Sequence, residues 1–463
     1  MTRPGGHSRG RRRELDPARR AAFDVLRAVS ERDAYANLAL PAILRERGIT
    51  GRDAAFATEL AYGTCRSRGL LDAVIARAAG RPVDRIDPVL LDLLRLGTYQ
   101  LLRTRVEQHA AVSTTVEHAG IEFDTARAGF VNGVLRTIAR RPEADWVDEL
   151  APPASADPVG HSAFVHAHPR WIAQAFSDAL GADAGELSAL LTSDDARPEV
   201  HLAARPSAIS AAELAEQVGG TVGRYSPYAV YLSGGDPGLI GPVRDGIALV
   251  QDEGSQLVAR ALTLAPLDGG DGADRGRWLD LCAGPGGKTA LLAAIGQAGV
   301  EGLRVTAVEP VAHRADLVRA NTAGLPVDVV EVDGRDSGLG PGFDRVLVDV
   351  PCTGLGALRR RPEARWRRQP ADVPALGKLQ RELLGGAIRL TRPGGVVLYA
   401  TCSPHLVETV GVVADAVRRY PVTAIDTRPL FEPADQLGPG PYVQLWPHRH
   451  GTDAMFAAAL QVG

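Results

Sequence analysis

Two of the four cysteines stand directly after apolar stretches that are typical of buried strands. Cys352 follows FDRVLVDVP, and Cys402 follows GGVVLYAT. A buried cysteine is usually an unreactive packing residue, but a thiol in a loop at a strand end is placed where it can act as a nucleophile. If the two strands are neighbours, about 4.8 Å apart, both thiols can face one pocket. The pattern therefore indicates thiol chemistry at one edge of a sheet.

A glycine-rich turn upstream supplies a second part of the predicted site. The segment LDLCAGPGGKT, Leu279 to Thr289, is typical of a buried strand, a tight turn and the start of a helix. The exposed N–H groups of such a helix start can receive a polar ligand. The turn has neither the GxGxxG spacing of dinucleotide sites nor the spacing of a phosphate-binding loop. It ends in Lys288, one of only two lysines in the chain, where the wider guanidinium of arginine would not replace a compact ammonium.

Acidic residues close three successive predicted strands. Glu309 follows RVTAV, Asp333 follows VDVVEV, and Asp349 follows FDRVLV. A carboxylate at such an edge accepts hydrogen bonds from ribose hydroxyls, as we expect for Glu309, and from the amino group of adenine, as we expect for Asp333. An adenosine cofactor without phosphate is indicated. S-adenosylmethionine (SAM) fits, because its positive sulfonium is stabilised among carboxylates.

A thiol beside SAM suits the methylation of a pyrimidine carbon. Carbon 5 of cytosine is a poor nucleophile, but a thiolate that adds to carbon 6 turns it into an enamine-like nucleophile and divides one difficult step into easier ones. The target base must be unstacked to reach the thiol and the cofactor. Spacing alone does not decide whether Cys352 or Cys402 is the nucleophile.

The elements that must position these residues are expected to form a multidomain protein. Residues 16–141 have apolar residues at helical spacing, so an all-α domain is predicted, with one helix starting at Asp87 and Pro88. A proline-rich linker is expected over 142–169, and a small α+β module over 170–250. Residues 251–463 alternate strands and helices and end in a hairpin, which is typical of an α/β Rossmann-fold methyltransferase. The polar cluster within IALVQDEGSQLV caps a helix or forms a wall of the site, and both interpretations stay open.

The charge pattern points to a polyanion. The formal net charge is only −3, yet seven arginines lie within residues 3–20 and six within 359–368. We expect residues 1–15 to be a disordered basic tail. The second cluster starts seven residues after Cys352 and is predicted to form an RNA groove with Arg359, Arg360, Arg361, Arg365, Trp366, Arg367 and Arg368. Six engaged arginines would give a log–log salt slope of about −4 on single-stranded RNA.

Composition sets further expectations. No apolar run approaches the ~18 residues that span a bilayer, and the arginine-rich start lacks the apolar segment of a secretory signal. The cysteines show no CxxC spacing, so neither a disulfide nor a metal site is expected. A cytoplasmic monomer is the prediction.

The chain resembles a known family at these motifs. LDLCAGPGGKT, DVPCTGLGALRRRPEARW and YATCS are similar to the motifs of the Fmu/Sun group of RNA 5-methylcytosine methyltransferases. The segments YGTCRSRGLLD, EQHAAVSTTVEHA and GFVNGVLR resemble the NusB-like RNA-binding fold. Together with QDEGSQLV they narrow the resemblance to the enzymes that act on small-subunit (16S) ribosomal RNA. The group commonly has alanine where Val350 stands and often serine where Thr353 stands.

The resemblance implies roles for particular residues. Cys402 would be the nucleophile, Cys352 would assist release of the methylated RNA, and Asp349 would contact the base near the methyl donor. Lys288 would belong to both the catalytic and the cofactor set. The residues implied to hold SAM are Cys282, Ala283, Gly284, Pro285, Gly286, Gly287, Lys288, Glu309, Asp333 and Asp349.

Two alternatives remain at this point. One is the same chemistry on transfer RNA or large-subunit ribosomal RNA. The other is a non-catalytic RNA-binding factor of ribosome assembly that kept the fold. The simultaneous presence of Lys288, Asp349, Cys352 and Cys402 speaks against the second.

Overall fold

The computed structural model describes residues 15–268 and 273–463, so all but the last residue of the predicted basic tail lies outside the described residues. The chain divides into two compact units, which are described separately. The first comprises Met1–His168 with Arg361–Glu363, and the second comprises Pro169–Arg360 with Ala364–Gly463.

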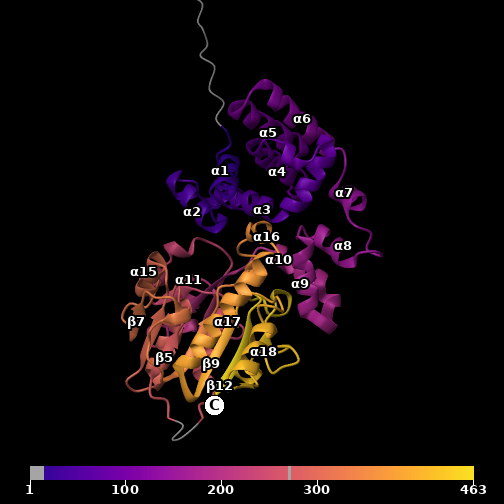
Figure 1. Ribbon diagram of the computed structural model, residues 1–463. Coiled ribbons are helices and arrows are strands. Elements are labelled where there is room, and N and C mark those ends of the chain that lie inside the picture. Colours follow the sequence, from indigo (N-terminus) through magenta and orange to yellow (C-terminus); the bar gives the residue numbers. More distant parts are fainter. Residues whose placement is uncertain (1–14, 269–272) are drawn as a thin grey trace, which may run out of the picture. The chain divides into compact units, whose positions relative to one another are not determined.

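The first unit is helical, as its sequence predicts (Figure 1). Its helices are α1 (Pro17–Arg32), α2 (Ala36–Glu46), α3 (Gly51–Ala79), α4 (Pro88–Arg103), α5 (Gln108–Glu122), α6 (Thr125–Ile138), α7 (Glu143–Leu150) and α8 (Pro158–Val165). The predicted helix start is confirmed, because the Asp87 carboxylate accepts hydrogen bonds from the first N–H groups of α4. Leucines of α4 and one face each of α1 and α3 pack into a single apolar core.

The segment 142–169 differs from the expected linker. It contains α7 and α8, each of eight residues. A helix of about two turns shows too few apolar repeats for its period to be read from sequence. Trp146 of α7 is buried in the core of this unit, so the segment packs against the helices that precede it.

The second unit begins with a small α+β module. Its elements are α9 (Arg170–Leu180), α10 (Leu187–Asp195), β1 (Val200–Ala204), α11 (Ala211–Val218), β2 (Thr221–Val222), β3 (Ala229–Leu232), α12 (Gly241–Arg244) and β4 (Ala248–Val250). The strands form a four-stranded antiparallel sheet in the order β2-β3-β1-β4. The predicted α+β character is thereby confirmed.

The rest of the second unit is built on an eight-stranded mixed sheet. Its elements are α13 (Glu253–Leu264), β5 (Arg277–Asp280), α14 (Gly287–Gly299), β6 (Arg304–Val308), α15 (Ala312–Asn321), β7 (Val327–Val330), β8 (Phe343–Asp349), α16 (Ala364–Arg367), α17 (Asp372–Leu390), β9 (Thr391–Thr401), α18 (Val410–Arg419), β10 (Val422–Ile425), β11 (Val443–Gln444), α19 (Pro447–His450) and β12 (Phe456–Val462). The order is β10-β12-β9-β8-β5-β6-β7, with β11 paired to β12. β12 runs antiparallel to its neighbours near one edge, as the Rossmann-fold methyltransferase interpretation requires.

Helices cover both faces of this sheet, because the strands are apolar on both sides. Along β9, Val396, Leu398 and Ala400 face the core that α13 and α14 close. Val397 and Tyr399 face the opposite core, which α17 and α18 close. Figure 1 shows α17 lying along the strands on that side. Burial on both faces is characteristic of α/β sheets, and it leaves the carboxyl edge of the parallel strands as the place for a site.

Candidate active site

The Sγ atoms of Cys352 and Cys402 lie 3.4 Å apart. The two cysteines follow β8 and β9, which pair in parallel with Asp349 opposite Ala400. The prediction that the two thiols meet at the carboxyl edge of the sheet is confirmed. The hydrogen bond with Cys402 and burial raise the pKa of the Cys352 thiol well above its ordinary value, which keeps Cys352 protonated.

An ion pair lies beside the two thiols. Lys288, in the first turn of α14, donates to Asp349 Oδ2 at 2.7 Å and to Ser255 Oγ at 3.2 Å. Burial acts to lower the pKa of Lys288, but the charge and the hydrogen bond of Asp349 outweigh it and leave the pKa raised. A thiolate at Cys402 would add a smaller attraction. The site therefore holds a permanent ammonium within electrostatic reach of a cysteine sulfur.

Asp280 is a site residue that the sequence analysis missed. It is buried at the end of β5, and it accepts hydrogen bonds from Thr289 Oγ1 at 2.7 Å and from the Cys282 N–H at 3.3 Å. Burial raises the pKa of Asp280 to about 6, with a further contribution from the charge of Asp349. An acidic residue inside the apolar run LDLC is the signal that could have identified it.

Glu309 lies against the glycine turn. Glu309 directly follows β6 in the chain, and its side chain is buried. Its carboxylate is 3.3 Å from the guanidinium of Arg314. Arg314 also donates to the carbonyl of Gly284 at 2.7 Å. A Cβ atom on Gly284 would lie only 2.2 Å from Glu309 Oε2, so no larger residue fits there without displacing the carboxylate. Gly286, the N-cap residue of α14, has φ +105°, a conformation that favours glycine.

Asp333 lies in a more exposed position. Its carboxylate, 46% exposed, pairs with Arg335 at 2.6 Å and caps the short turn that follows. The hydrogen bond from Arg335 lowers its pKa. Gly334 approaches the end of β5, since a Cβ there would lie 2.9 Å from the carbonyl oxygen of Leu281. The strand end is thus beside the glycine turn, while the carboxylate itself is engaged by arginine.

Gln251 presents a buried amide to the start of α14. Its side chain is 8% exposed, and within the described part of the chain its amide nitrogen and oxygen have no hydrogen-bond partner. A Cβ atom on Gly287 would lie 3.6 Å from the Gln251 Cδ. An unpaired buried amide costs free energy, which a polar ligand at this helix start would offset.

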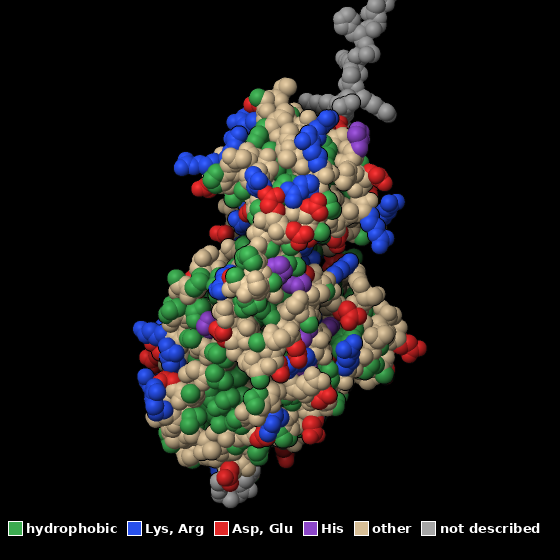
Figure 2. All heavy atoms as spheres, turned by 90° about the vertical axis from the view of Figure 1, so that its right-hand side faces the viewer, with side chains coloured by type: hydrophobic (Ala, Val, Ile, Leu, Met, Phe, Trp, Pro, Cys, Tyr) green, Lys and Arg blue, Asp and Glu red, His purple; other side chains and the backbone are tan. Residues whose placement is uncertain are grey.

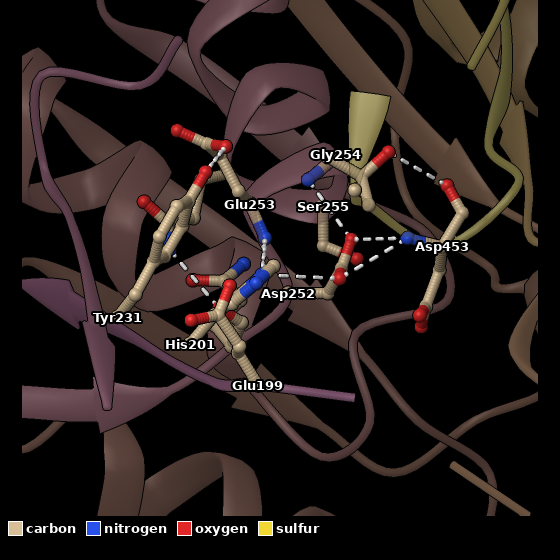
Figure 3. Close-up of polar contacts among 12 residues, drawn as sticks. Glu199, His201, Tyr231, Asp252, Glu253, Gly254, Ser255 and Asp453 are labelled. Carbon is tan, nitrogen blue, oxygen red and sulfur yellow. Dashed lines mark hydrogen bonds and ion pairs between the residues drawn. The ribbon is translucent and has the colours of Figure 1, made fainter. Parts of the chain in front are cut away.

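The polar cluster before the glycine turn serves both of the purposes left open by the sequence. Asp252 is the N-cap of α13, and Ser255 in the first turn of that helix reaches Lys288. Asp252 is also the centre of a buried network, where it lies between His201 and the backbone of Asp453 (Figure 3). Burial opposes its ionisation, but the hydrogen bond from His201 and the charges of two arginines hold its pKa well below the ordinary value.

Those two arginines are Arg359 and Arg360, which the sequence analysis assigned to RNA. Arg359, 6% exposed, donates to Asp453 at 3.0 Å and to Asp252 at 3.2 Å, and Arg360 contacts the same two carboxylates. Arg365 is fully buried and pairs with Asp195 at 2.9 Å. The prediction that these three side chains bind RNA is wrong. They form internal ion pairs, and buried guanidinium groups with carboxylate partners are not available to phosphates. They anchor the loop that follows Cys352.

The remaining members of the predicted groove are less enclosed. Arg361 is exposed, while Trp366, Arg367 and Arg368 are partly buried. The first unit offers a mixed surface, since basic side chains are interspersed with acidic ones over it on the face shown in Figure 2.

The four cysteines are free thiols. No group of three or more potential metal ligands occurs among residues 15–268 and 273–463. Among the described helices, none has both the length and the apolar character that crossing a bilayer requires.

Fold and site together define a class: a methyltransferase-type Rossmann domain with paired cysteines, in one chain with a helical domain. Comparisons with known proteins agree. The family model of the 16S rRNA methyltransferase RsmB/F matches residues 262–461, and that of the NusB family matches residues 16–140.

Relatives extend over almost the whole chain. A Mycobacterium tuberculosis protein, named as a methyltransferase without a substrate in its name, is 77% identical over 98% of both chains. The ribosomal RNA small subunit methyltransferase B of Pseudomonas putida is 34% identical and covers 87% of this chain and 89% of its own. The crystal structure of PH0851 has the same fold, with a TM-score of 0.79 over 97% of this chain and 99% of its own at 21% identity. The chain belongs to the RsmB/F family of 16S rRNA methyltransferases.

Proposed function

We propose that the protein transfers a methyl group from SAM to carbon 5 of a cytosine in small-subunit ribosomal RNA. The observation that carries the proposal is the 3.4 Å approach of the Cys352 and Cys402 sulfurs beside the Lys288–Asp349 ion pair. The name of the Pseudomonas putida relative supports the choice of RNA.

The residues at the carboxyl edge of the sheet are suited to binding SAM. Burial raises the pKa of the Cys282 thiol, and the charges of Asp280, Asp349 and Glu309 raise it further, so three carboxylates lie within electrostatic reach of this loop. Such a set suits a cationic sulfur, and Glu309 would accept hydrogen bonds from the ribose. When bound, SAM supplies an electrophilic methyl group. Residues 282–288, Glu309 and Asp333 would hold it, and the unpaired amide of Gln251 offers a further polar contact at the start of α14.

Cys402 is proposed as the nucleophile. Its thiolate forms the bond to carbon 6 of the cytosine, and the displaced π electrons make carbon 5 nucleophilic. Two features favour this assignment over Cys352. The ammonium of Lys288 would attract a thiolate at Cys402, whereas the hydrogen bond with Cys402 and burial favour the thiol form of Cys352 by raising its pKa.

The other residues have separate tasks. The carboxylate of Asp349, oriented by Lys288, accepts a hydrogen bond from N3 of the cytosine, which takes up a proton as the adduct forms, and so stabilises the adduct. After methylation a water molecule takes the proton from carbon 5, the electrons of that C–H bond restore the ring double bond, the bond from carbon 6 to Cys402 breaks to give back the thiolate, and N3 gives up its proton. Cys352, within hydrogen-bond distance of the leaving sulfur, assists this release.

The test is incubation of the protein with methyl-labelled SAM and small-subunit RNA that lacks modifications, followed by mapping of the labelled base. One 5-methylcytosine in that RNA is expected, with transfer RNA and large-subunit RNA unlabelled. Label in another RNA would contradict the substrate. Absence of label in all three, with RNA binding retained, would favour the non-catalytic assembly factor.

A further inference from the structure

Glu408 is a buried carboxylate for which the proposed reaction has no use. It lies six residues after Cys402, just before α18, and its side chain is fully buried. The described residues provide no lysine, arginine or histidine within ion-pair distance of it. Burial of an uncompensated charge is costly unless every lone pair is hydrogen-bonded, so the position calls for a structural or functional reason.

Four donors satisfy this carboxylate. Glu408 Oε1 accepts from the backbone N–H of Thr353 at 2.9 Å and from Gln380 Nε2 at 2.9 Å. Oε2 accepts from Thr353 Oγ1 at 2.5 Å and from Ser403 Oγ at 2.6 Å. All four donors are neutral, so the geometry of the contacts rather than a counter-charge holds the group in place.

The donors are the immediate neighbours of the two reactive cysteines. Thr353 follows Cys352, and Ser403 follows Cys402. The hydroxyl oxygens of Thr353 and Ser403 are 3.1 Å apart, so both loops meet at one carboxylate. Gln380 of α17 also donates to the carbonyl of Pro351 at 2.9 Å, which fixes the other side of Cys352.

We propose that Glu408 is a positioning residue that clamps the Cys352 loop to the Cys402 loop and thereby sets the distance between the two sulfurs. The inference extends the proposed function, in which both thiols act on one base. Without the clamp the loops keep other contacts, such as the hydrogen bond from the Gly356 N–H to the carbonyl of Cys402 at 2.8 Å, but the residues next to the two thiols lose their shared acceptor and the thiols lose their common orientation.

An arylarsine oxide tests the clamp in the free enzyme. One molecule binds two thiols with the loss of one water only when both sulfurs reach the same arsenic atom, and Cys352→Ala must abolish this binding. Glu408→Ala is expected to weaken it by about tenfold or more, because several hydrogen bonds between the loops are lost. Glu408→Gln is isosteric, and its amide accepts from the Thr353 N–H and donates to the hydroxyls, so binding within about threefold of the wild type is expected.

Controls separate this role from a general effect on folding. Glu301→Ala removes an exposed glutamate and should leave arsenical binding unchanged. If Glu408→Ala does not fold, the double variant Thr353→Val with Ser403→Ala removes both hydroxyl donors and should weaken arsenical binding in the same way. Wild-type arsenical affinity in folded Glu408→Ala or in the double variant would overturn the proposal, as would a loss in Glu408→Gln equal to that in Glu408→Ala.

Methylation kinetics give a second readout. Glu408→Ala should lower kcat and leave the KM for RNA and for SAM nearly unchanged, because the proposed clamp orients thiols that act only in the chemical step. A raised KM with an unchanged kcat would contradict a positioning role. The arsenical assay uses neither RNA nor SAM, so it tests the clamp independently of the proposed substrate.

Discussion

The ammonium of Lys288 lies 2.7 Å from the carboxylate of Asp349, although 61 residues separate them in the chain. Lys288 lies in the first turn of α14 and Asp349 ends β8, so the pair joins the predicted cofactor loop to the predicted base-binding strand end. Its side chains remain 15% and 26% exposed, which leaves room for a ligand to compete for the contact.

Lys288→Met should lower kcat/KM by about 10²- to 10³-fold, because a preorganised charged donor next to the reacting sulfur is lost. Lys288→Arg should also be impaired, since the wider guanidinium does not fit the turn. Steady-state methylation is the measurement, and Lys378→Met, at a side chain 77% exposed, is the matched control. Activity of Lys288→Met equal to that of the control would remove Lys288 from the catalytic set.

Glu309→Gln should weaken SAM binding by about 10- to 100-fold, because hydrogen bonds from ribose to a charged acceptor become bonds to a neutral one. Asp333→Asn should have a smaller effect, since the carboxylate of Asp333 is 46% exposed and solvent weakens its hydrogen bonds, whereas that of Glu309 is buried. Titration calorimetry with SAM measures both. Asp316→Asn, on an exposed side chain of α15, should bind as the wild type does. A larger loss of SAM affinity in Asp333→Asn than in Glu309→Gln would mean that Asp333 contributes more to SAM binding than Glu309 does.

Asp280 should make stability depend on pH. Its pKa is raised from 3.8 to about 6 in the folded protein, so the folded state binds more protons than the unfolded state between about pH 4 and 6. The contribution of Asp280 to stability is therefore largest below pH 4 and is lost as pH rises through 6. Two pKa units correspond to about 3 kcal/mol. Denaturant unfolding at pH 4 and pH 7 should show the wild type losing about that much relative to Asp280→Asn. If the difference in unfolding free energy between the wild type and Asp280→Asn were the same at pH 4 and pH 7, the pKa of Asp280 would be ordinary.

The arginines after Cys352 should contribute less to RNA binding than their number suggests. With Arg359, Arg360 and Arg365 in internal ion pairs, at most three arginines of the cluster remain for RNA, so the salt slope should be no steeper than about −2 instead of −4. Arg359→Ala should leave this slope unchanged and destabilise the fold by about 3 kcal/mol, because buried carboxylates lose a partner. Arg361→Ala should reduce the slope by about 0.7 without such a loss. A reduced slope for Arg359→Ala would return that residue to the RNA surface.

The sheet and the thiol pair were predictable because their signals are local. Apolar runs that end in Glu309, Asp349 and Cys402 identify parallel strands, and parallel strands share one carboxyl edge. The short helix α7 was not predictable, since two turns do not establish a period.

Long-range pairing explains the errors in the site. Arg359 looks like part of a basic groove in sequence, and its carboxylate partner Asp252 lies 107 residues earlier in the chain. Glu408 is an ordinary acidic residue in sequence, and only the fold brings Thr353 to it across 55 residues. Burial and partners of charged residues depend on such tertiary contacts, which spacing along the chain does not encode.

The central claim is that Cys402 attacks the cytosine and Cys352 permits release. The most direct measurement is a denaturing gel of the enzyme after incubation with SAM and substrate RNA, with Cys402→Ala and Cys352→Ala run beside the wild type. We predict a stable covalent protein–RNA band for Cys352→Ala and none for Cys402→Ala. A band for Cys402→Ala and none for Cys352→Ala would reverse the two roles, and a band for neither would contradict a cysteine adduct.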